Sequence, residues 1–258
     1  MNLNTAKYLH ELNNRFYQEQ GESFAATRGA PWQGWQRCLD VVEAEHPELS
    51  TQSVDVLDLA CGNRRFEVFI EEAWDDSAIE YFGVDNSDEM SAAGGQGHYQ
   101  DLDILGLLID GGVGAAINQL ESPTCEIVGS FGFMHHIPGQ QLRKDLLDLM
   151  IERTTPGGFI VVSFWQFLNS PELAAKAEVT HATVKTELLD FDATQLEQGD
   201  YFLGWQGREG AYRYCHSFSE SEIDELESHA TKKTVTAARF KADGRTGNLN
   251  QYLILEKN

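Results

Sequence analysis

The feature that most constrains the fold is a regular alternation of short apolar segments with helical ones between residues 54 and 165. Four segments have the composition of buried strands, 54–60, 79–85, 125–134 and 159–165, and a shorter strand is expected at 99–105. Helical patterns separate them. Strands that alternate with helices form a parallel sheet with helices on both faces. The sequence therefore predicts an α/β fold with a mostly parallel sheet.

The helices around this core are predicted from the spacing of apolar residues and from the residues that begin and end helices. Residues 4–19 and 33–45 are expected to be helical before the first strand. A helix is weakly indicated at 104–120, where Gly111, Gly112 and Gly114 oppose it, and strongly at 140–154, where Pro156-Gly157-Gly158 ends it.

The C-terminal third departs from this rhythm. Residues 168–215 are polar and irregular, with a helix near 171–189. A helix at 218–230, with Ser219 as N-cap, leads to strands at 233–242 and 250–257, which should form an antiparallel hairpin. We therefore expect one domain with four parts: an N-terminal helical cover (1–50), a core (51–165), a substrate-side insertion (166–217) and a C-terminal helix and hairpin (218–258).

The charge of the chain limits its partners. There are 41 acidic and 19 basic residues in 258, a net charge of −22. Residues 1–207 hold 33 of the acids and 11 of the bases, whereas 208–258 hold 8 of each. Because phosphate binding needs clustered Lys and Arg, this balance argues against DNA and anionic membranes, and any contact with tRNA should be local.

Other features favour a cytoplasmic protein. The longest apolar runs are too short to span a membrane, and the polar N-terminus lacks the apolar stretch of a secretory signal. Cys38, Cys61, Cys125 and Cys215 fit no zinc spacing and no small disulfide framework, so we expect free thiols.

Acidic residues stand at the ends of successive predicted strands. Asp58 lies before the Cys61-Gly62-Asn63 turn, Asp85 ends the second strand and Asp101 lies in the third. Ligands of parallel sheets bind at these ends, and an acid after the second strand suits a ribose diol. The turn lacks the glycine spacing of dinucleotide sites, so the pattern favours a nucleoside without a pyrophosphate. The alternative is that these acids only cap helices.

Four motifs resemble those of class I S-adenosylmethionine-dependent methyltransferases. They are LDLACGN at 57–63, GVD at 83–85, GFMHHIP at 132–138 and TTPGGFIVVSFW at 154–165. The resemblance implies a Rossmann-like methyltransferase domain and S-adenosylmethionine as cofactor. The residues that it places at the cofactor are Asp58, Ala60, Gly62, Asn63, Asp85, Asn86, Asp101, Leu102, Phe131 and His135.

By this resemblance, Asp58 and Gly62 would line the methionine portion, Asp85 would hold the ribose, and Asp101 with Leu102 would face the adenine. Ala60 and Arg64 replace two glycines of the family's first motif. We expect the larger Arg64 to reshape the mouth of the pocket. A binding module that has kept the fold and lost the cofactor therefore stays open as an alternative.

Two flanking segments resemble a narrower group, the tRNA wobble-uridine carboxymethyl methyltransferases. Residues 24–32 read FAATRGAPW and residues 213–218 read RYCHSF, similar to the F-S-x-T-R-x-x-P-W and R-Y-Y-H-x-F motifs of that group. The resemblance implies methyl transfer to a carboxylate, with a small activating partner subunit in some members.

The chemistry of such a reaction makes few demands on the protein. A carboxylate is ionised at neutral pH, so it needs alignment and dry surroundings rather than a general base. Arginine matches a carboxylate with two parallel hydrogen bonds. Arg28 and Arg213 are therefore the candidates for holding the acceptor, and Tyr214 and His216 for shaping its pocket. The alternative is that they only attach the terminal segments to the core.

Two points complete the sequence-based hypothesis. His135 and His136 follow the fourth strand, but adjacent histidines point in different directions and no carboxylate motif accompanies them, so we predict no metal site. The acceptor is either tRNA or a small molecule, and the sequence does not decide between them.

Overall fold

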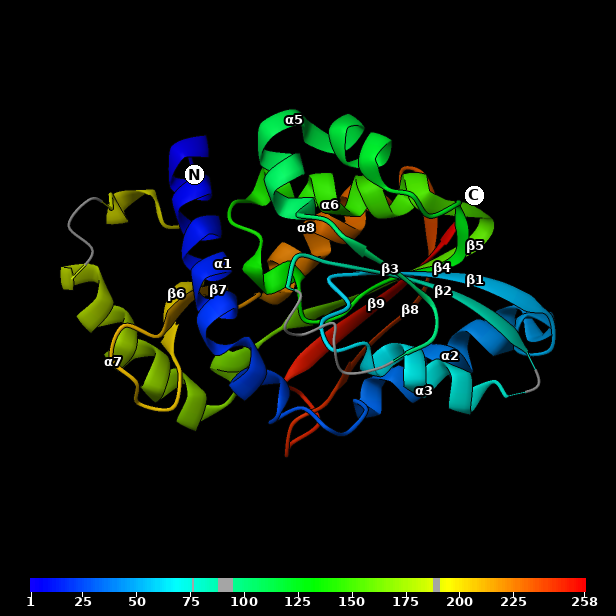
Figure 1. The fold of residues 1–258 in the computed structure, drawn as a ribbon, viewed down its shortest axis with the longest axis horizontal. Coiled ribbons are helices and arrows are strands. Elements are labelled where there is room, and N and C mark those ends of the chain that lie inside the picture. Colours follow the sequence, from blue (N-terminus) through cyan, green and yellow to red (C-terminus); the bar gives the residue numbers. More distant parts are fainter. Residues whose placement is uncertain (76, 88–94, 188–190) are drawn as a thin grey trace.

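The computed structural model describes residues 1–75, 77–87, 95–187 and 191–258, and within these residues a seven-stranded sheet forms the centre (Figure 1). Its order is β3-β2-β1-β4-β5-β9-β8. Strands β1 to β5 are parallel, β9 is antiparallel to β5, and β8 is antiparallel to β9. The strands are β1 (Ser53–Leu59), β2 (Ala78–Asp85), β3 (His98–Asp101), β4 (Cys125–Ser130), β5 (Thr154–Trp165), β8 (Thr234–Ala242) and β9 (Asn250–Lys257). The predicted parallel sheet with an antiparallel C-terminal hairpin is confirmed.

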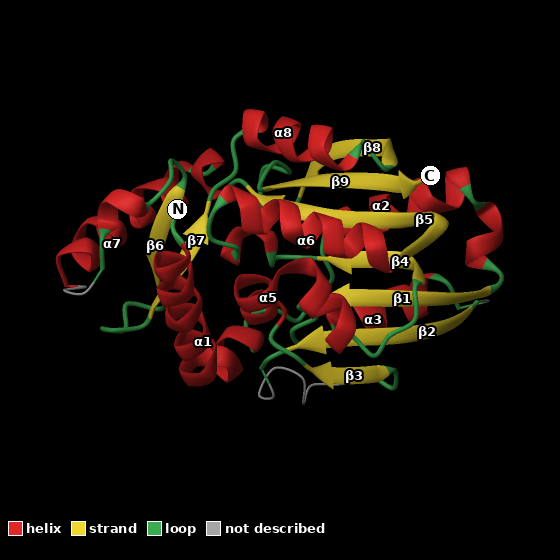
Figure 2. Cartoon of the chain, turned by 90° about the horizontal axis from the view of Figure 1, so that it is seen from above, coloured by secondary structure: helices red, strands yellow, loops and turns green. Residues whose placement is uncertain are grey.

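Helices cover both faces of this sheet. Figure 2 shows α5 (Ile104–Gln119), α6 (Gln140–Arg153) and α8 (Glu220–Ala230) on one face, and α2 (Gln33–Glu45) and α3 (Arg65–Ala73) on the other. Side chains of a strand alternate between faces. In β1, Leu57 and Leu59 accordingly join the cluster under α5, α6 and α8, whereas Val54 and Val56 join the cluster under α2 and α3. Each such burial contributes about 1.5–3 kcal/mol relative to an exposed side chain.

A group of elements that we call the cap lies beyond the carboxyl ends of the parallel strands, which point toward it (Figure 2). It consists of α1 (Leu3–Ala25), α7 (Pro171–Glu187) and a two-stranded antiparallel sheet of β6 (Asp200–Gly204) and β7 (Tyr212–His216). Leu9 and Leu12 of α1 pack with Val184, Phe202 and Tyr214 of the other cap elements. The cap thus joins the N-terminal segment to residues 171–216, far away in the chain.

Short 3-10 helices complete the described elements. They are η1 (Pro47–Ser50), η2 (Met134–His136), η3 (Phe167–Asn169) and η4 (Ala193–Gln195). No helix in the described part of the chain is long and apolar enough to cross a lipid bilayer.

Some predicted boundaries were wrong for identifiable reasons. The fourth strand ends at Ser130 rather than 134, because Gly132 has a φ of +74° and turns the chain into η2. The fifth begins at Thr154, before Pro156, and the irregular pairing between Cys125 and Ile127 of β4 accommodates the Pro-Gly-Gly segment. The third strand stops at Asp101. The hairpin of β6 and β7 was not predicted.

Candidate active site

A cavity of about 600 Å³ lies between the carboxyl ends of the strands and the cap. This volume is typical of sites for cofactors and small ligands. We call one side the sheet end, formed mainly by Asp58, Ala60, Cys61, Gly62, Asn63, Asp85, Asn86, Ser87, Leu102 and Asp103. We call the other the cap end, formed mainly by Tyr17, Phe24, Arg28, His135, His136, Trp165, Trp205 and Arg213. Phe131 also lines the cavity.

The turn after β1 brings backbone N–H groups to the sheet end. Ala60, Gly62 and Arg64 have positive φ values of 61°, 54° and 56°. This path lets the N–H of Gly62 donate to Oδ2 of Asp85 at 2.8 Å. The left-handed conformation costs a residue with a Cβ about 1–2 kcal/mol. Ala60 and Arg64 therefore adopt a backbone conformation that favours glycine, although neither is one.

The size of Arg64 leads us to expect that it reshapes the mouth of the cavity. The structure shows that it does not. Its side chain is buried and makes two hydrogen bonds to Glu67, from Nε to Oε2 at 2.6 Å and from Nη2 to Oε1 at 2.9 Å. Nη2 also donates to the carbonyl oxygen of Gly97 at 2.7 Å. Arg64 is not among the residues that line the cavity, so this replacement leaves room for a ligand.

Two carboxyl groups face the sheet end, that of the buried Asp58 and that of the half-buried Asp85. Oδ2 of Asp58 accepts from the hydroxyl of Tyr81 at 2.6 Å, whereas its buried Oδ1 has no hydrogen-bond partner among the described residues. Burial raises the pKa of Asp58 to about 7. Burial also raises the pKa of Asp85, to about 6, although the N–H groups of Gly62 and Ser87 oppose the increase. A buried acceptor without a partner is costly, and a ligand that donates to Asp58 would remove that cost.

The third strand presents a different acid from the predicted one. Asp101 is exposed and does not line the cavity, whereas Leu102 and Asp103 do. Oδ1 of Asp103 accepts from the N–H of Gly106 at 2.9 Å and caps α5, and Oδ2 lies 2.7 Å from Nε2 of His10. The prediction failed because β3 stops at Asp101, so the chain turns toward the cavity only after it. Asp103 is the acid that a ligand at this position would meet.

Helix α1 contributes four polar lining residues that the sequence analysis had not singled out. They are His10, Asn13, Asn14 and Tyr17. Asn14 accepts from the side chain of Asn86 at 3.1 Å, which links α1 to the end of β2. The four residues have the i, i+3, i+4, i+7 spacing of a single helical face. That polar stripe, beside the apolar one of Leu9, Leu12 and Phe16, was the available signal.

At the cap end, the two predicted arginines converge among aromatic rings. The guanidinium of Arg28 lies 3.4 Å from the centroid of the Phe24 ring. That of Arg213 lies 5.0 Å from the Phe16 ring, 5.2 Å from Phe24 and 5.7 Å from Trp205. Cations over aromatic faces are stabilised by about 0.5–2 kcal/mol. The aromatic rings therefore hold both cations beside the cavity.

Several polar atoms at the cap end are buried without a partner. Nε and Nη1 of Arg213, which is 6% exposed, have no hydrogen-bond partner among the described residues, and neither has Nδ1 of His135. Burial, followed by the charges of His136 and Arg213, lowers the pKa of His135 well below its usual value. The cap end thus offers cationic donors and a neutral imidazole to a ligand.

The structure places Tyr214 and His216 outside the cavity. Both side chains are 0% exposed and neither lines it. The Tyr214 hydroxyl donates to Oδ1 of Asp200 at 2.6 Å, and His216 lies between Asp200 and Glu222. Because side chains alternate along β7, Arg213 faces the cavity while these two residues face away. Neither side chain therefore forms part of the wall of the cavity, which is the role that the sequence analysis gives them.

His135, His136 and Cys215 come together at the inner wall of the cap end. Their ligand atoms lie within 4.8 Å of one another. His136, however, uses both ring nitrogens: Nδ1 is 3.0 Å from the carbonyl oxygen of Tyr214, and Nε2 is 2.8 Å from the hydroxyl of Tyr17. Burial also raises the pKa of the Cys215 thiol to about 11. These contacts fit hydrogen bonding better than metal ligation.

Comparison with known proteins identifies the fold. No family model and no curated sequence matches the chain. Among solved structures, it is similar to magnesium protoporphyrin IX methyltransferase from Synechocystis with bound S-adenosylhomocysteine (TM-score 0.57, 13% identity, covering 95% of this chain and 97% of that one). Others are a 1,6-didemethyltoxoflavin N1-methyltransferase from Burkholderia thailandensis (0.57, 13%, 98% and 90%) and a methyltransferase from Methanosarcina mazei (0.56, 14%, 80% and 92%). The chain therefore has the fold of class I S-adenosylmethionine-dependent methyltransferases.

Proposed function

We propose that this protein is an S-adenosylmethionine-dependent methyltransferase that methylates a carboxylate. The sheet end supports the cofactor: Gly62 and Asp85 form the turn described above, and Asp58 offers an unpaired oxygen to a ligand donor. Structures of the same fold hold this cofactor or its demethylated product. By the sequence resemblance, Asp85 accepts from the ribose hydroxyls and Asp58 lies beside the methionine portion.

The acceptor is inferred from Arg213, and this is the observation that carries the proposal. Its Nε and Nη1 donors are buried beside the cavity and have no partner in the described part of the protein. Unpaired buried donors on a cation are costly, and a carboxylate between Arg213 and Arg28 would satisfy them. A neutral acceptor could satisfy the unpaired Nδ1 of His135, but it would leave the charges of the two arginines without a counter-charge.

The residues of the chain then have defined tasks. When bound, the cofactor would supply an electrophilic methyl group to the acceptor carboxylate, and cleavage of the carbon–sulfur bond would give a methyl ester and S-adenosylhomocysteine. No proton is transferred, so the neutral His135 need not act as a base. Arg213 and Arg28 orient the acceptor, and the aromatic rings of the cap exclude water.

The surface charges favour a small-molecule acid as acceptor. The basic residues of β8, the best candidates for a tRNA-binding track, are paired with acids. Arg239 contacts Glu220, Asp224 and Glu227, and Lys241 also contacts Glu220. Paired cations release few counterions and therefore contribute little to nucleic-acid binding. The cavity of about 600 Å³ suits the cofactor and a compact acceptor.

The carboxymethyl group of a tRNA wobble uridine is the second candidate acceptor. It is favoured by the meeting at one cavity of Arg28 and Trp32 from the first flanking motif with Arg213 from the second. In that case, a small partner subunit would have to supply basic surface. Both candidates fit a cytoplasmic location, since the four cysteines are buried free thiols.

Cofactor binding is tested by titrating S-adenosylhomocysteine in a calorimeter. The wild type should bind, and Asp85→Ala should weaken binding at least about 100-fold. Asp101→Ala is the matched control: Asp85 and Asp101 are register partners on β2 and β3, but only Asp85 lines the cavity. Absence of heat with the wild type would instead support a binding module that has lost the cofactor.

The acceptor is tested by incubating the protein with methyl-labelled cofactor and either total small RNA or a metabolite extract. Base-labile label in the metabolite fraction supports a small carboxylic acid, because methyl esters hydrolyse in mild alkali. Label in the RNA fraction alone would support the second candidate. Base-stable label in either fraction would contradict methylation of a carboxylate.

A further inference from the structure

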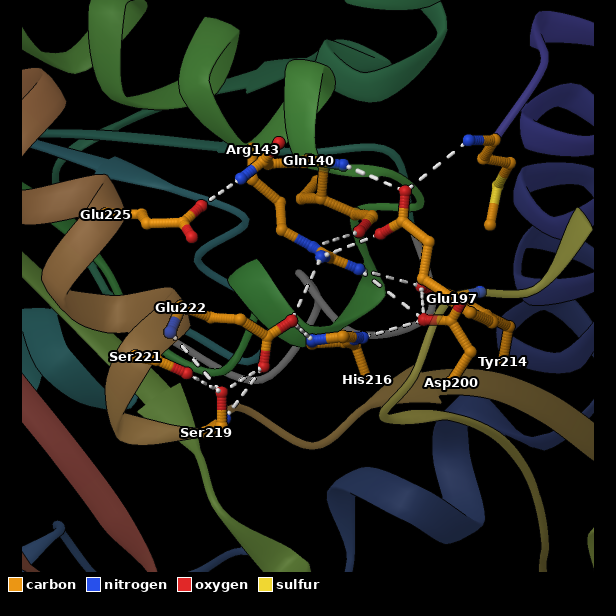
Figure 3. Close-up of polar contacts among 12 residues, drawn as sticks. Gln140, Arg143, Glu197, Asp200, Tyr214, His216, Ser219, Ser221, Glu222 and Glu225 are labelled. Atoms are coloured by element: carbon orange, nitrogen blue, oxygen red, sulfur yellow. Dashed lines mark hydrogen bonds and ion pairs between the residues drawn. The ribbon is translucent and has the colours of Figure 1, made fainter.

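Figure 3 shows a hydrogen-bond network that joins the core to the cap. It involves Tyr214 and His216, the residues of β7 that do not line the cavity. Its centre is Asp200, whose side chain is 0% exposed. Oδ1 of Asp200 accepts from the Tyr214 hydroxyl at 2.6 Å and lies 2.7 Å from Nδ1 of His216. Oδ2 accepts from the N–H of Glu197 at 2.8 Å. One carboxylate thus holds the first residue of β6 to two residues of β7.

Arg143 connects this centre to the core. It belongs to α6, is 2% exposed, and extends its guanidinium into the cap. It donates to the Tyr214 hydroxyl at 3.2 Å and lies 3.5 Å from Asp200. Its Nε donates to the carbonyl oxygen of Ile137 at 3.0 Å. The network therefore fixes β7 relative to a helix that packs on the central sheet.

Glu222 of α8 closes the network on its outer side. Nε2 of His216 lies 2.9 Å from Oε1 of Glu222. Burial alone would raise the pKa of Glu222, but hydrogen bonds from His216 and Ser219 lower it to about 2. Both ring nitrogens of His216 therefore lie within hydrogen-bond distance of carboxylate oxygens.

The backbone of Tyr214 is also held, from the cavity side. The N–H of Tyr214 donates to Oδ1 of Asn13 at 2.7 Å, and the Asn13 side chain donates back to its carbonyl oxygen at 3.1 Å. His136 lies 3.0 Å from the same oxygen. The residue next to Arg213 is thus fixed through both its backbone and its side chain.

We propose that Asp200 and Tyr214 are positioning residues for Arg213, and that through β7 they hold its unpaired donors in the geometry that binds the acceptor carboxylate. This inference rests on the proposed function. Replacing buried ion networks by apolar groups is often neutral for stability, so stability alone does not explain the arrangement. Donors that are held in place before the ligand binds save the cost of ordering them, and displacement by 1 Å can cost about 100-fold in rate.

The test is a double-mutant cycle that needs no knowledge of the natural acceptor. The probe is 4-fluorobenzoate, an aromatic carboxylate, and its Kd is measured by fluorine NMR with S-adenosylhomocysteine at saturation. The variants are Tyr214→Phe, Arg213→Lys and the double variant. Tyr214→Phe keeps the ring and removes only the hydroxyl that Asp200 and Arg143 hold, and Asp200→Asn provides a second, stronger perturbation.

If Tyr214 acts through Arg213, Tyr214→Phe should weaken probe binding about 5- to 10-fold in the wild type and less than about 2-fold in the Arg213→Lys background. Such non-additivity is the signature of coupled residues, whereas independent residues give additive losses. Additive losses, or an unchanged Kd in Tyr214→Phe and Asp200→Asn, would overturn the inference.

Thr234→Val is the matched control. It removes a buried hydroxyl that donates to the carbonyl oxygen of Ala230 at 3.0 Å, and neither residue lines the cavity. It should match the stability loss of Tyr214→Phe but leave the Kd of the probe unchanged; an equal loss of probe binding would mean that general loosening explains the effect.

The affinity for S-adenosylhomocysteine separates this inference from the proposed function. It should stay within about 2-fold of the wild type in all these variants. A wild type that does not bind S-adenosylhomocysteine would reject the proposed function, whereas one that binds it but not the probe would reject Arg213 as an anion site and with it this inference.

Discussion

The two ends of the cavity are built in opposite ways. The sheet end uses consecutive strand ends, backbone N–H groups and two acids with raised pKa values, Asp58 and Asp85. The cap end uses aromatic rings and two arginines, Arg28 and Arg213, from segments about 185 residues apart. The proposed cofactor site is thus formed by the central sheet and its turns, whereas the proposed acceptor site depends on how the cap is attached to the sheet.

The largest expected effect separates the two ends by a single substitution. Arg213→Met keeps most of the side-chain volume and removes the cation. The kcat/KM for methyl transfer to the fraction that accepts the label, small RNA or metabolites, should therefore fall about 100-fold or more. The affinity for S-adenosylhomocysteine should change by less than about 2-fold. A variant that loses both together would show that the ends are not independent.

The pH should change the affinity for S-adenosylhomocysteine through the two acids of the sheet end, Asp58 and Asp85. Asp58 and Asp85 must ionise to accept hydrogen bonds as carboxylates, so affinity for S-adenosylhomocysteine should rise about 10-fold between pH 5 and pH 8. Asp58→Asn should flatten this profile above pH 6, since the pKa of Asp85 is raised only to about 6. Binding that weakens as the pH rises would contradict the assignment.

The same two groups predict the pH dependence of stability without ligand. Their pKa values, about 7 and about 6, exceed that of an exposed aspartic acid, so the folded state binds protons more tightly than the unfolded state. Their contribution to stability is greatest near pH 4 and is lost as the pH rises toward 7. Asp58→Asn should reduce this slope in urea titrations, and S-adenosylhomocysteine should oppose the loss.

A smaller effect is expected from the aromatic rings of the cap end. Trp205→Leu removes one of the aromatic rings that contact the Arg213 guanidinium. It also removes the hydrogen bond from Nε1 of Trp205 to the hydroxyl of Ser23 at 2.9 Å. Probe binding by 4-fluorobenzoate should weaken about 3- to 10-fold, as a cation–π contact of about 1 kcal/mol implies. Trp74→Leu, a buried tryptophan that does not line the cavity, should leave the Kd unchanged.

The smallest effect concerns the backbone of the sheet end. Ala60 adopts a φ of 61°, so Ala60→Gly should be neutral or stabilise the protein by up to about 1 kcal/mol in chemical denaturation. Gly62→Ala, two residues away with a φ of 54°, should destabilise it by about 1 kcal/mol. Destabilisation by Ala60→Gly would show that the methyl group of Ala60 has a packing role.

The sequence led to residues that line the sheet end because the signals there are local. Asp58 and Asp85 lie at the ends of strongly apolar strands, the Gly62 turn follows the first of them, and parallel strands bring their ends to one edge. Asp101 was wrongly placed because the exact end of a four-residue strand decides which neighbour faces inward. Asp103 follows two positions later.

The cap end could be predicted only in part. Arg28 and Arg213 were identified through resemblance to known motifs, not through any pattern that places them together. Tyr214 and His216 were misassigned because β7 has five residues and its polar side chains are buried by pairing with Asp200, so no alternation of apolar and polar residues marks the strand. The polar face of α1 can be recognised in the sequence, but nothing there indicates that this face lines the cavity.

The pairing of Arg239 and Lys241 with the acids of α8 has a kinetic consequence. With these cations neutralised and a net charge of −22, the field around the molecule repels an anion until it reaches Arg213 inside the cavity. An acidic acceptor therefore approaches against the field, and added salt, which screens that repulsion, should speed its association. The protein would then capture its substrate faster in a salty medium than in a dilute one.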